Sequence, residues 1–293
     1  CPSSPHLSSA RLKLGIIHFQ DGHYDEARKP LQKIPDKHVL RADADYYLAW
    51  TDLDSRKPVD AAKRFQFLSK RLARSTPKHR LIALSDLYQG VAEFEGSRFA
   101  ESIQTLSKFV ANFSGHEKLD EAVFNLGLAQ MELGKWDDAI KSFETVPGKS
   151  TLHDRALYQA AWSKRSNAKP GEAVPYYKAL LEKHASSPLV NNVALELAEV
   201  EFETGGEAGG ADSVERLTAL LNKKPSPNAQ LRRLAFYRLG IVQFKQKKYL
   251  ESAIAFEDML SDATEDLLIS AAWQAGEARR EVAVAAQGPA KER

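Results

Sequence analysis

Cysteine, an excess of one charge sign and long apolar runs are all missing or scarce in this chain. Cys1 is the one cysteine among 293 residues, so the sequence can form neither an internal disulfide nor a cysteine-based zinc site. No apolar run approaches the ~18–20 residues that cross a bilayer, so we expect no transmembrane segment.

The charge balance argues against a nucleic-acid coat protein. Lys and Arg number 41 and Asp and Glu number 39, for a net charge of +2. Proteins that coat DNA or RNA are usually far more basic. Hydrophobic residues at 43% and charged residues at 27% are typical of a folded chain and exclude wholesale disorder. We therefore expect a protein or peptide partner rather than nucleic acid.

Motifs of the common enzyme classes are also missing. The sequence contains no HExxH, GxSxG, GxGxxG or P-loop pattern. Its eight histidines are scattered, and His18 and His23 are five residues apart, which does not place them on one helical face. We predict no catalytic residue, no metal site and no cofactor, so the chain is expected not to be an enzyme. An enzyme with a composite site remains the remote alternative.

What the sequence does contain is an internal repeat. Residues 125–147 (NLGLAQMELGKWDDAIKSFETVP) share a skeleton with residues 13–35 and 238–260. Small residues recur at intervals of a few tens of residues, which indicates a repeat architecture. These small residues are Gly15, Ala49, Gly90, Gly127, Ala161, Ala198, Gly240 and Gly276.

The pattern resembles the tetratricopeptide repeat. In that repeat a small residue of the first helix is followed by a turn, an alanine of the second helix and a later aromatic. In the clearest copy the small residue Gly127 is followed by Gly134 and Trp136 in the Gly-x-Tyr turn, by Ala139 and by Phe143. The resemblance implies an all-α, right-handed superhelix, an α-solenoid of about seven helix pairs plus a C-terminal capping helix. Gly costs roughly 0.5–1 kcal/mol in a helix relative to Ala, so its recurrence indicates close helix packing.

The repeats leave short ends and one irregular segment. We predict a flexible tail at residues 1–8, a single solenoid over residues 9–285 and a second tail at residues 286–293. Residues 205–212 (GGEAGGAD) are expected to be a surface loop between two helices. A phosphate-binding loop is disfavoured there because no Lys-Ser/Thr pair follows.

A narrower resemblance concerns the links between repeats. Residues 107–127 and 178–198 are similar to repeats of bacterial cell-envelope proteins, including the TolA-binding protein and the lipoprotein of the β-barrel assembly machinery. This resemblance implies a periplasmic place in the cell envelope. Cys1 precedes the polar stretch PSSPHLSS, as the lipid-bearing cysteine of a mature bacterial lipoprotein precedes its tether. We name Cys1 as a hypothetical lipidation site and outer-membrane anchor. An arbitrary start of the segment is the alternative.

The candidate binding surface is the concave groove of the superhelix. The resemblance places there the first-helix residues that flank each small residue, and most of them are aromatic or aliphatic. They are Tyr46, Trp50, Phe124, Leu128, Tyr158, Trp162, Tyr237 and Ile241, with Arg165 one turn beyond Trp162. An apolar lining favours peptide segments with apolar anchors. Core packing is the competing interpretation for Tyr46, Phe124 and Tyr158, and a solvated side chain is the alternative for Arg165.

A basic run, residues 63–80, contains seven Lys and Arg and no acid. A solvated helix face is the commonest explanation of such a run, and contact with anionic lipid head groups or with an acidic partner is the alternative. Nucleic acid is a further alternative, but the run lacks interleaved aromatics on the same face. Taken together, the sequence favours a non-enzymatic protein-interaction scaffold and adaptor of the bacterial cell envelope. The alternative is an assembly or regulatory module of a larger cytoplasmic protein.

Overall fold

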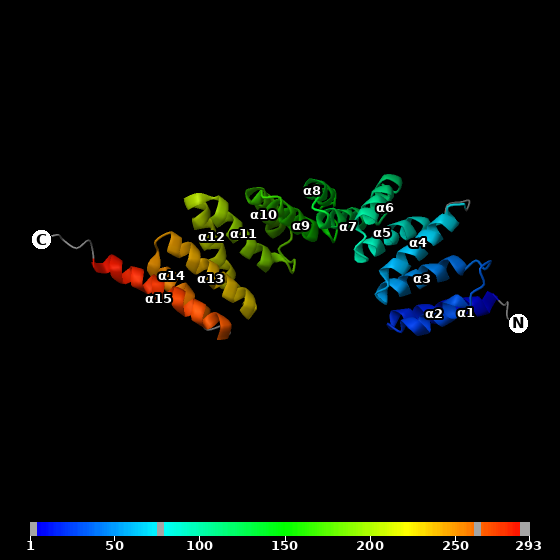
Figure 1. Ribbon diagram of the computed structural model, residues 1–293, viewed down its shortest axis with the longest axis horizontal. Coiled ribbons are helices and arrows are strands. Elements are labelled where there is room, and N and C mark those ends of the chain that lie inside the picture. The colour runs from blue at the N-terminus through cyan, green and yellow to red at the C-terminus, as the bar shows by residue number, and fades with distance from the viewer. Residues whose placement is uncertain (1–4, 75–78, 261–264, 288–293) are drawn as a thin grey trace. The chain divides into compact units, whose positions relative to one another are not determined.

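The computed structural model describes residues 5–74, 79–260 and 265–287, and its regular elements there are all helical. Contacts divide the chain into two compact units, residues 1–153 and residues 154–293, which are taken in turn below. Within each unit, helices follow one another as packed pairs (Figure 1). We call the first helix of a pair the A helix and the second the B helix.

The first unit contains four pairs. They are α1 (Pro5–Gln20) with α2 (Tyr24–Gln32), α3 (Arg41–Asp54) with α4 (Pro58–Leu72), α5 (Leu81–Glu95) with α6 (Phe99–Asn112), and α7 (Leu119–Glu132) with α8 (Trp136–Glu144).

The second unit contains three pairs and a final helix. They are α9 (His153–Ser166) with the 3-10 turn η1 (Pro170–Ala173) and α10 (Val174–Lys183), α11 (Val190–Thr204) with α12 (Gly206–Leu221), α13 (Ala229–Lys245) with α14 (Tyr249–Leu260), and α15 (Glu265–Gln287). The predicted all-α solenoid of seven pairs plus a terminal helix is confirmed.

The contact between an A-helix glycine and a B-helix side chain recurs through both units. A Cβ atom added at Gly127 would lie 2.6 Å from the Phe143 ring, and one at Gly240 would lie 2.7 Å from the Phe256 ring. Leu31 and Leu106 cover Gly15 and Gly90 in the same way. These covering side chains are fully or almost fully buried. The glycines are therefore selected by packing, which offsets their cost in helix propensity.

The turns between A and B helices also repeat. Six of them place one residue at positive φ: Gly22, Arg56, Ser97, Gly134, Ala168 and Lys247. The backbone there reverses direction in the left-handed region, where only glycine avoids a steric cost. Four of the six positions nevertheless carry a side chain, so the helix packing on both sides holds the turn in place.

Residues 206–212 are helical and only Gly205 separates α11 from α12, so the prediction of a surface loop is wrong. Gly205 caps the C-terminal end of α11, Gly206 begins α12 at φ 57°, and Gly209 and Gly210 are buried within α12. A Cβ atom at Gly209 would lie 2.0 Å from the carbonyl oxygen of Glu201. The glycines thus allow the backbones of α11 and α12 to touch, a packing role that a glycine-rich string does not reveal by itself.

The ends of the helical array differ from the predicted boundaries. Helix α1 begins at Pro5, inside the predicted tail of residues 1–8, because proline is accepted in the first helical turn. Helix α15 continues to Gln287, past the predicted end at residue 285. Gly276 of α15 is exposed, and no described atom lies within 4 Å of a Cβ built there, so the expected close packing is missing at this one glycine.

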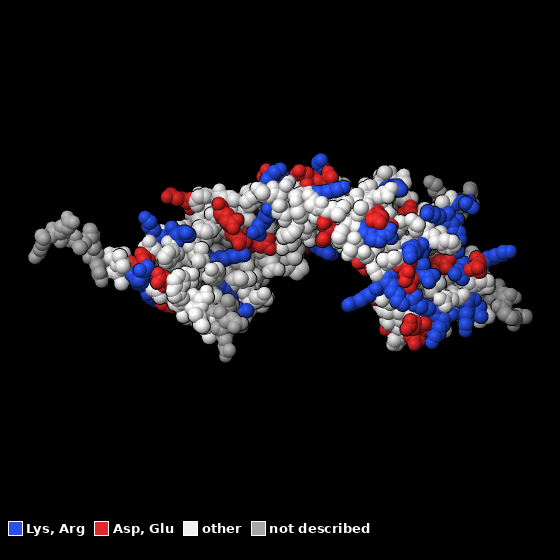
Figure 2. Space-filling view, viewed as in Figure 1, with Lys and Arg blue, Asp and Glu red and all other residues white. Residues whose placement is uncertain are grey.

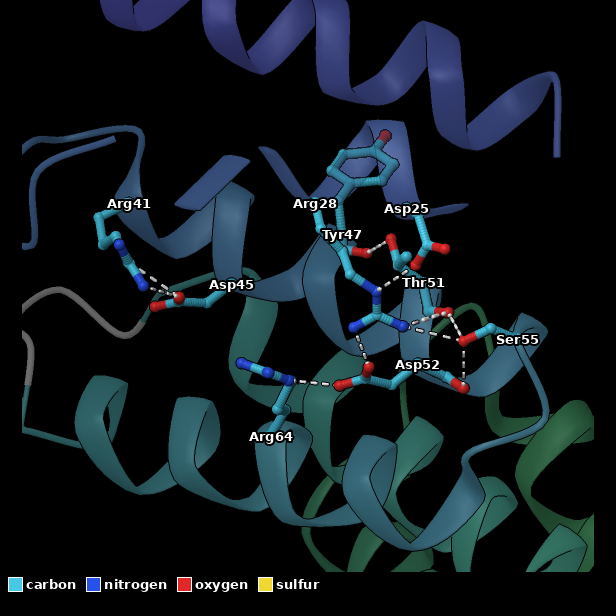
Figure 3. A network of polar contacts seen from close by, with 9 residues as sticks. All are labelled: Asp25, Arg28, Arg41, Asp45, Tyr47, Thr51, Asp52, Ser55 and Arg64. Atoms are coloured by element: carbon cyan, nitrogen blue, oxygen red, sulfur yellow. Dashed lines mark hydrogen bonds and ion pairs between the residues drawn. The ribbon is translucent and has the colours of Figure 1, made fainter. Parts of the chain in front are cut away.

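A polar network joins α2, α3 and α4 in the first unit (Figure 3). Asp52 of α3 is 2% exposed and accepts hydrogen bonds from Arg28 of α2 and Arg64 of α4. Arg28 also donates to Ser55 at 2.9 Å. Two turns earlier on α3, the Asp45 carboxylate is paired with Arg41. A buried carboxylate is tolerated when it is paired and hydrogen-bonded in this way, and the network fixes three helices to one another.

Leucine at Gly127 and leucine at Gly276 form a matched pair of substitutions. Gly127→Leu is expected to lower the free energy of unfolding by ~1–3 kcal/mol or more, because the side chain would overlap the Phe143 ring. Gly276→Leu is expected to leave it unchanged or to raise it by up to about 1 kcal/mol, because the site is open and leucine favours helix. Denaturant melts of both variants measure this, and equal effects would contradict the packing described above.

Candidate functional site

Two of the predicted groove residues of the first unit, Tyr46 and Trp50, belong to an aromatic cluster. Trp50 lies 4.5 Å from Tyr88 between ring centroids, and both Tyr46 and Trp50 meet the ring of Phe65 edge to face. Tyr46 and Trp50 are half-buried, whereas Phe65 and Tyr88 are buried. Because edge-to-face pairs stabilise a core beyond their buried area, this cluster contributes to the packing of α3, α4 and α5.

Phe124 is a core residue. Its side chain is 3% exposed and packs on Phe143 at 5.7 Å between centroids, so it offers little surface to a partner. Leu128, one turn further along α7, is half-buried. In the first unit the predicted groove residues therefore lie mostly inside the helical layer.

The second unit holds a polar network that joins the A helices α9, α11 and α13 and the B helix α10, and the sequence did not predict it. Tyr158 of α9 and Tyr177 of α10 donate hydrogen bonds to the two carboxylate oxygens of Glu196 of α11, at 2.7 and 2.6 Å. Arg165 donates to Glu196 at 3.1 Å and to Glu199 at 3.0 Å. Arg238 of α13 pairs with Glu199 at 3.1 Å. The guanidinium of Arg165 is thus occupied within the unit, rather than being held for an acidic partner.

This network changes the ionisation of its tyrosines. Burial, the hydrogen bond to Glu196 and the negative charge of Glu196 raise the pKa of Tyr158 to about 12. The same three causes raise the pKa of Tyr177. Both phenols therefore stay neutral donors through the physiological range, while Arg165 and Arg238 balance the charges of Glu196 and Glu199.

A pocket of about 360 Å³ adjoins this network. It is lined by Tyr237 and Ile241, which were predicted to be groove residues, and by residues that the sequence did not indicate. The missed residues are Glu199, Phe202, Glu203, Ser213, Leu234, Arg238 and Val242. Tyr237 is 37% exposed and Leu234 is 42% exposed, and both also line a neighbouring pocket of about 390 Å³ near the start of α15. Leu234 lies three residues before Tyr237, and this helical spacing was the available signal.

Trp162 is placed apart from both pockets. Its side chain is 41% exposed on α9, and it is not among the residues that line either pocket. Tyr237 and Ile241 are therefore the predicted residues that the structure brings together with apolar and charged neighbours. Cys1, the hypothetical lipidation site, lies outside the described residues.

The basic run, residues 63–80, contains arginines that are paired with acids of α3 and one exposed aromatic residue. Lys and Arg side chains gather over α3 and α4 of the first unit (Figure 2). Arg71 pairs with Asp45 at 2.6 Å, and Arg64 pairs with Asp52. Phe67, in the same run, is 62% exposed with the Arg71 guanidinium 5.8 Å from its ring centroid. The prediction that the basic run lacks an interleaved aromatic side chain is therefore wrong.

Two searches bear on other kinds of site. Among the described residues, no three His, Cys, Asp or Glu side chains are grouped as metal ligands. None of the described helices combines the length and the apolar character needed to cross a bilayer.

Comparison with known proteins identifies the repeats. One tetratricopeptide repeat profile matches residues 9–38 and 121–149, and a second matches residues 158–225. No curated protein matches the chain. The matched segments of the chain are tetratricopeptide repeats.

Solved structures share its fold. The C-terminal part of a TPR repeat-containing protein from Cytophaga hutchinsonii matches 89% of this chain and 98% of its own, with a TM-score of 0.71 and 14% identity. A tetratricopeptide repeat protein from Parabacteroides merdae matches 92% of this chain and 99% of its own, with a TM-score of 0.56 and 13% identity. The MamA protein matches 62% of this chain and 94% of its own, with a TM-score of 0.52 and 22% identity. At these identities the likeness shows the fold alone.

Alanine substitution distinguishes Trp50, which packs in the aromatic cluster, from Trp162, which is more exposed. Trp50→Ala is expected to cost ~3 kcal/mol of unfolding free energy, because it empties one side of the aromatic cluster. Trp162→Ala, at a side chain that is 41% exposed, is expected to cost less than about half as much. Denaturant melts measure both, and a larger loss for Trp162→Ala would contradict this assignment.

Alkaline titration tests the Glu196 network. Since the pKa of Tyr158 rises from 10.0 to about 12 on folding, its contribution to stability is complete below pH 10 and is lost as the pH rises towards 12. Ultraviolet titration of the folded protein should show a late-ionising set among its nine tyrosines, and Tyr158→Phe should reduce that set by one. A single transition of all tyrosines near pH 10 would contradict the network.

Proposed function

We propose that this chain is a non-enzymatic scaffold that binds a segment of another protein on the A helices of its second unit. The observation that carries the proposal is the pocket where Phe202, Leu234, Tyr237 and Ile241 meet the paired Glu199 and Arg238. Its apolar wall accepts a side chain of the partner, and its fixed charges orient the partner backbone.

The arrangement of charges supports binding without catalysis. Glu196 and Glu199 are each held by hydrogen bonds or ion pairs from two or three side chains. A general acid or base needs a proton to move near neutral pH, whereas the tyrosines of this network have raised pKa values. The network therefore serves as a preorganised wall of the pocket, and preorganisation lowers the entropy cost of binding.

We place the scaffold in the bacterial cell envelope as an adaptor. The support is the similarity of residues 107–127 and 178–198 to links in envelope repeat proteins. Mass spectrometry of the native protein tests this part alone: a lipid mass on Cys1 supports it, and a native chain that runs through Cys1 without lipid contradicts it.

A selected peptide tests the pocket. Peptides from a phage-displayed random library, selected on the wild-type protein, are expected to bind through an apolar anchor. Tyr237→Ala and Leu234→Ala should weaken that binding tenfold or more, as expected for an anchor contact worth ~1.4–2 kcal/mol. Leu250→Ala is the matched control, because Leu250 is 47% exposed on α14 and lines neither pocket. Equal binding to all three variants would refute the assignment.

A further inference from the structure

The last helix, α15, has the residues of an A helix. Gly276 continues the series of small A-helix residues, and Trp273 lies three residues before it. The same spacing relates Tyr46 to Ala49, Phe124 to Gly127 and Tyr237 to Gly240. Helix α15 therefore carries the two positions that a B helix covers in the other repeats.

In those repeats one B-helix side chain covers both positions. The rings of Tyr46 and Phe65 lie 5.8 Å apart, those of Phe124 and Phe143 5.7 Å, those of Tyr158 and Tyr177 6.3 Å, and those of Tyr237 and Phe256 6.1 Å. Phe143 and Phe256 also lie directly over Gly127 and Gly240. The aromatic and the small residue of an A helix thus form one receptor for a large B-helix side chain.

On α15 this receptor is uncovered. Trp273 is 62% exposed, and no described atom would contact a Cβ at Gly276. Ile269 and Val284, on the same helical face, are 80% and 57% exposed. The opposite face packs through Ala271, Ala275 and Ala278, which are buried. A terminal helix of a solenoid normally has a polar outer face, whereas the exposed face of α15 is apolar except at Arg280, which pairs with Glu277 and Glu281.

The described part of this chain does not cover the receptor itself. In the fourth repeat the chain turns back at Gly134, which has a φ of 67°. The corresponding residue of α15 is Ala283, and it lies within the helix, which continues to Gln287. The chain thus runs on as A helix through the residues where a turn to its own B helix would lie.

We propose that α15 binds an amphipathic helix of a partner protein that takes the place of a B helix. The covering helices of the other repeats define its chemistry: a small residue followed four residues later by a large apolar one. These pairs are Ala27 and Leu31, Ala61 and Phe65, Ser102 and Leu106, Ala139 and Phe143, Ala173 and Tyr177, and Ser252 and Phe256. The partner helix places its large side chain over Gly276 and against Trp273.

A second copy of this chain is the less suitable occupant. Every one of those small and large side chains is buried within its own repeat in the described structure. A second copy would have to unfold a repeat to offer such a helix, whereas a separate amphipathic helix has its apolar face available. The proposal does not depend on the pocket of the second unit, because neither Trp273 nor Gly276 lines it.

A helical peptide with the sequence of residues 248–260 (KYLESAIAFEDML), stapled and fluorescently labelled, is the probe. Its fluorescence anisotropy should rise on titration with the wild-type protein. Trp273→Ala and Gly276→Leu should each weaken binding at least tenfold, the first by removing the facing ring and the second by filling the receptor. A peptide carrying Phe256→Ala should bind at least tenfold more weakly to the wild-type protein.

Controls make the outcome decisive. Tyr237→Ala, which removes a wall of the proposed peptide pocket, should leave this binding unchanged, so failure here and failure of the pocket are distinguishable. Circular dichroism melts check that Gly276→Leu is folded, and Trp273→Ala is a second variant that adds no bulk. The proposal is overturned if the probe does not bind, or if both α15 variants bind it as the wild type does. It is equally overturned if the protein alone forms dimers that Gly276→Leu abolishes, since a second copy would then cover α15.

Discussion

The contact between a small A-helix residue and a large B-helix side chain is the constraint on which the rest of this structure depends. Gly127 under Phe143 and Gly240 under Phe256 bring the two helices of a pair within touching distance, and every other feature takes its register from that point. The aromatic three residues earlier can reach the same B-helix ring, and the residue after the small one faces the neighbouring A helix. A side chain's place in the register therefore determines whether it is packed, hydrogen-bonded or left exposed.

The register explains why the fold could be predicted from the sequence and the site only in part. The glycines and alanines at helix crossings can be recognised in the sequence, and their spacing predicted all seven helix pairs. The exposure of a side chain depends on which residues of the next repeat pack against it, and the sequence alone does not show this. Phe124 and Tyr237 hold the same position, yet Phe124 is buried beside Phe143 and Tyr237 is 37% exposed on a pocket. Glu199 holds in α11 the position of Trp50 and Trp162, and only coordinates show that Arg165 and Arg238 meet there.

The glycine-rich segment, residues 205–212, also shows that the role of a residue depends on the helix packed against it. Four glycines in residues 205–212 read as a loop, because glycine is a poor helix former. The structure uses them where two backbones touch, at the carbonyl oxygen of Glu201, a contact that no residue with a Cβ could allow at Gly209. The buried Glu201 side chain then bonds Arg216 of α12, at 2.9 and 3.0 Å. Close approach and ion pair are thus added to the apolar crossing, where Ala198 and Leu217 are buried in one cluster as in the other repeats.

These departures from the repeat are where specificity can reside. A perfect repeat offers the same surface at every step, so it cannot distinguish one position along a ligand from another. In the first unit an aromatic cluster fills the space between the A helices α3 and α5. In the second unit a pocket has both charged and apolar lining residues. On α15, Gly276 and Trp273 are exposed. Each departure changes which residues are exposed without changing the helix pairs beneath. The small-residue crossing thus keeps the helix pairs constant, while single substitutions at fixed register positions give each part of the chain a different exposed surface.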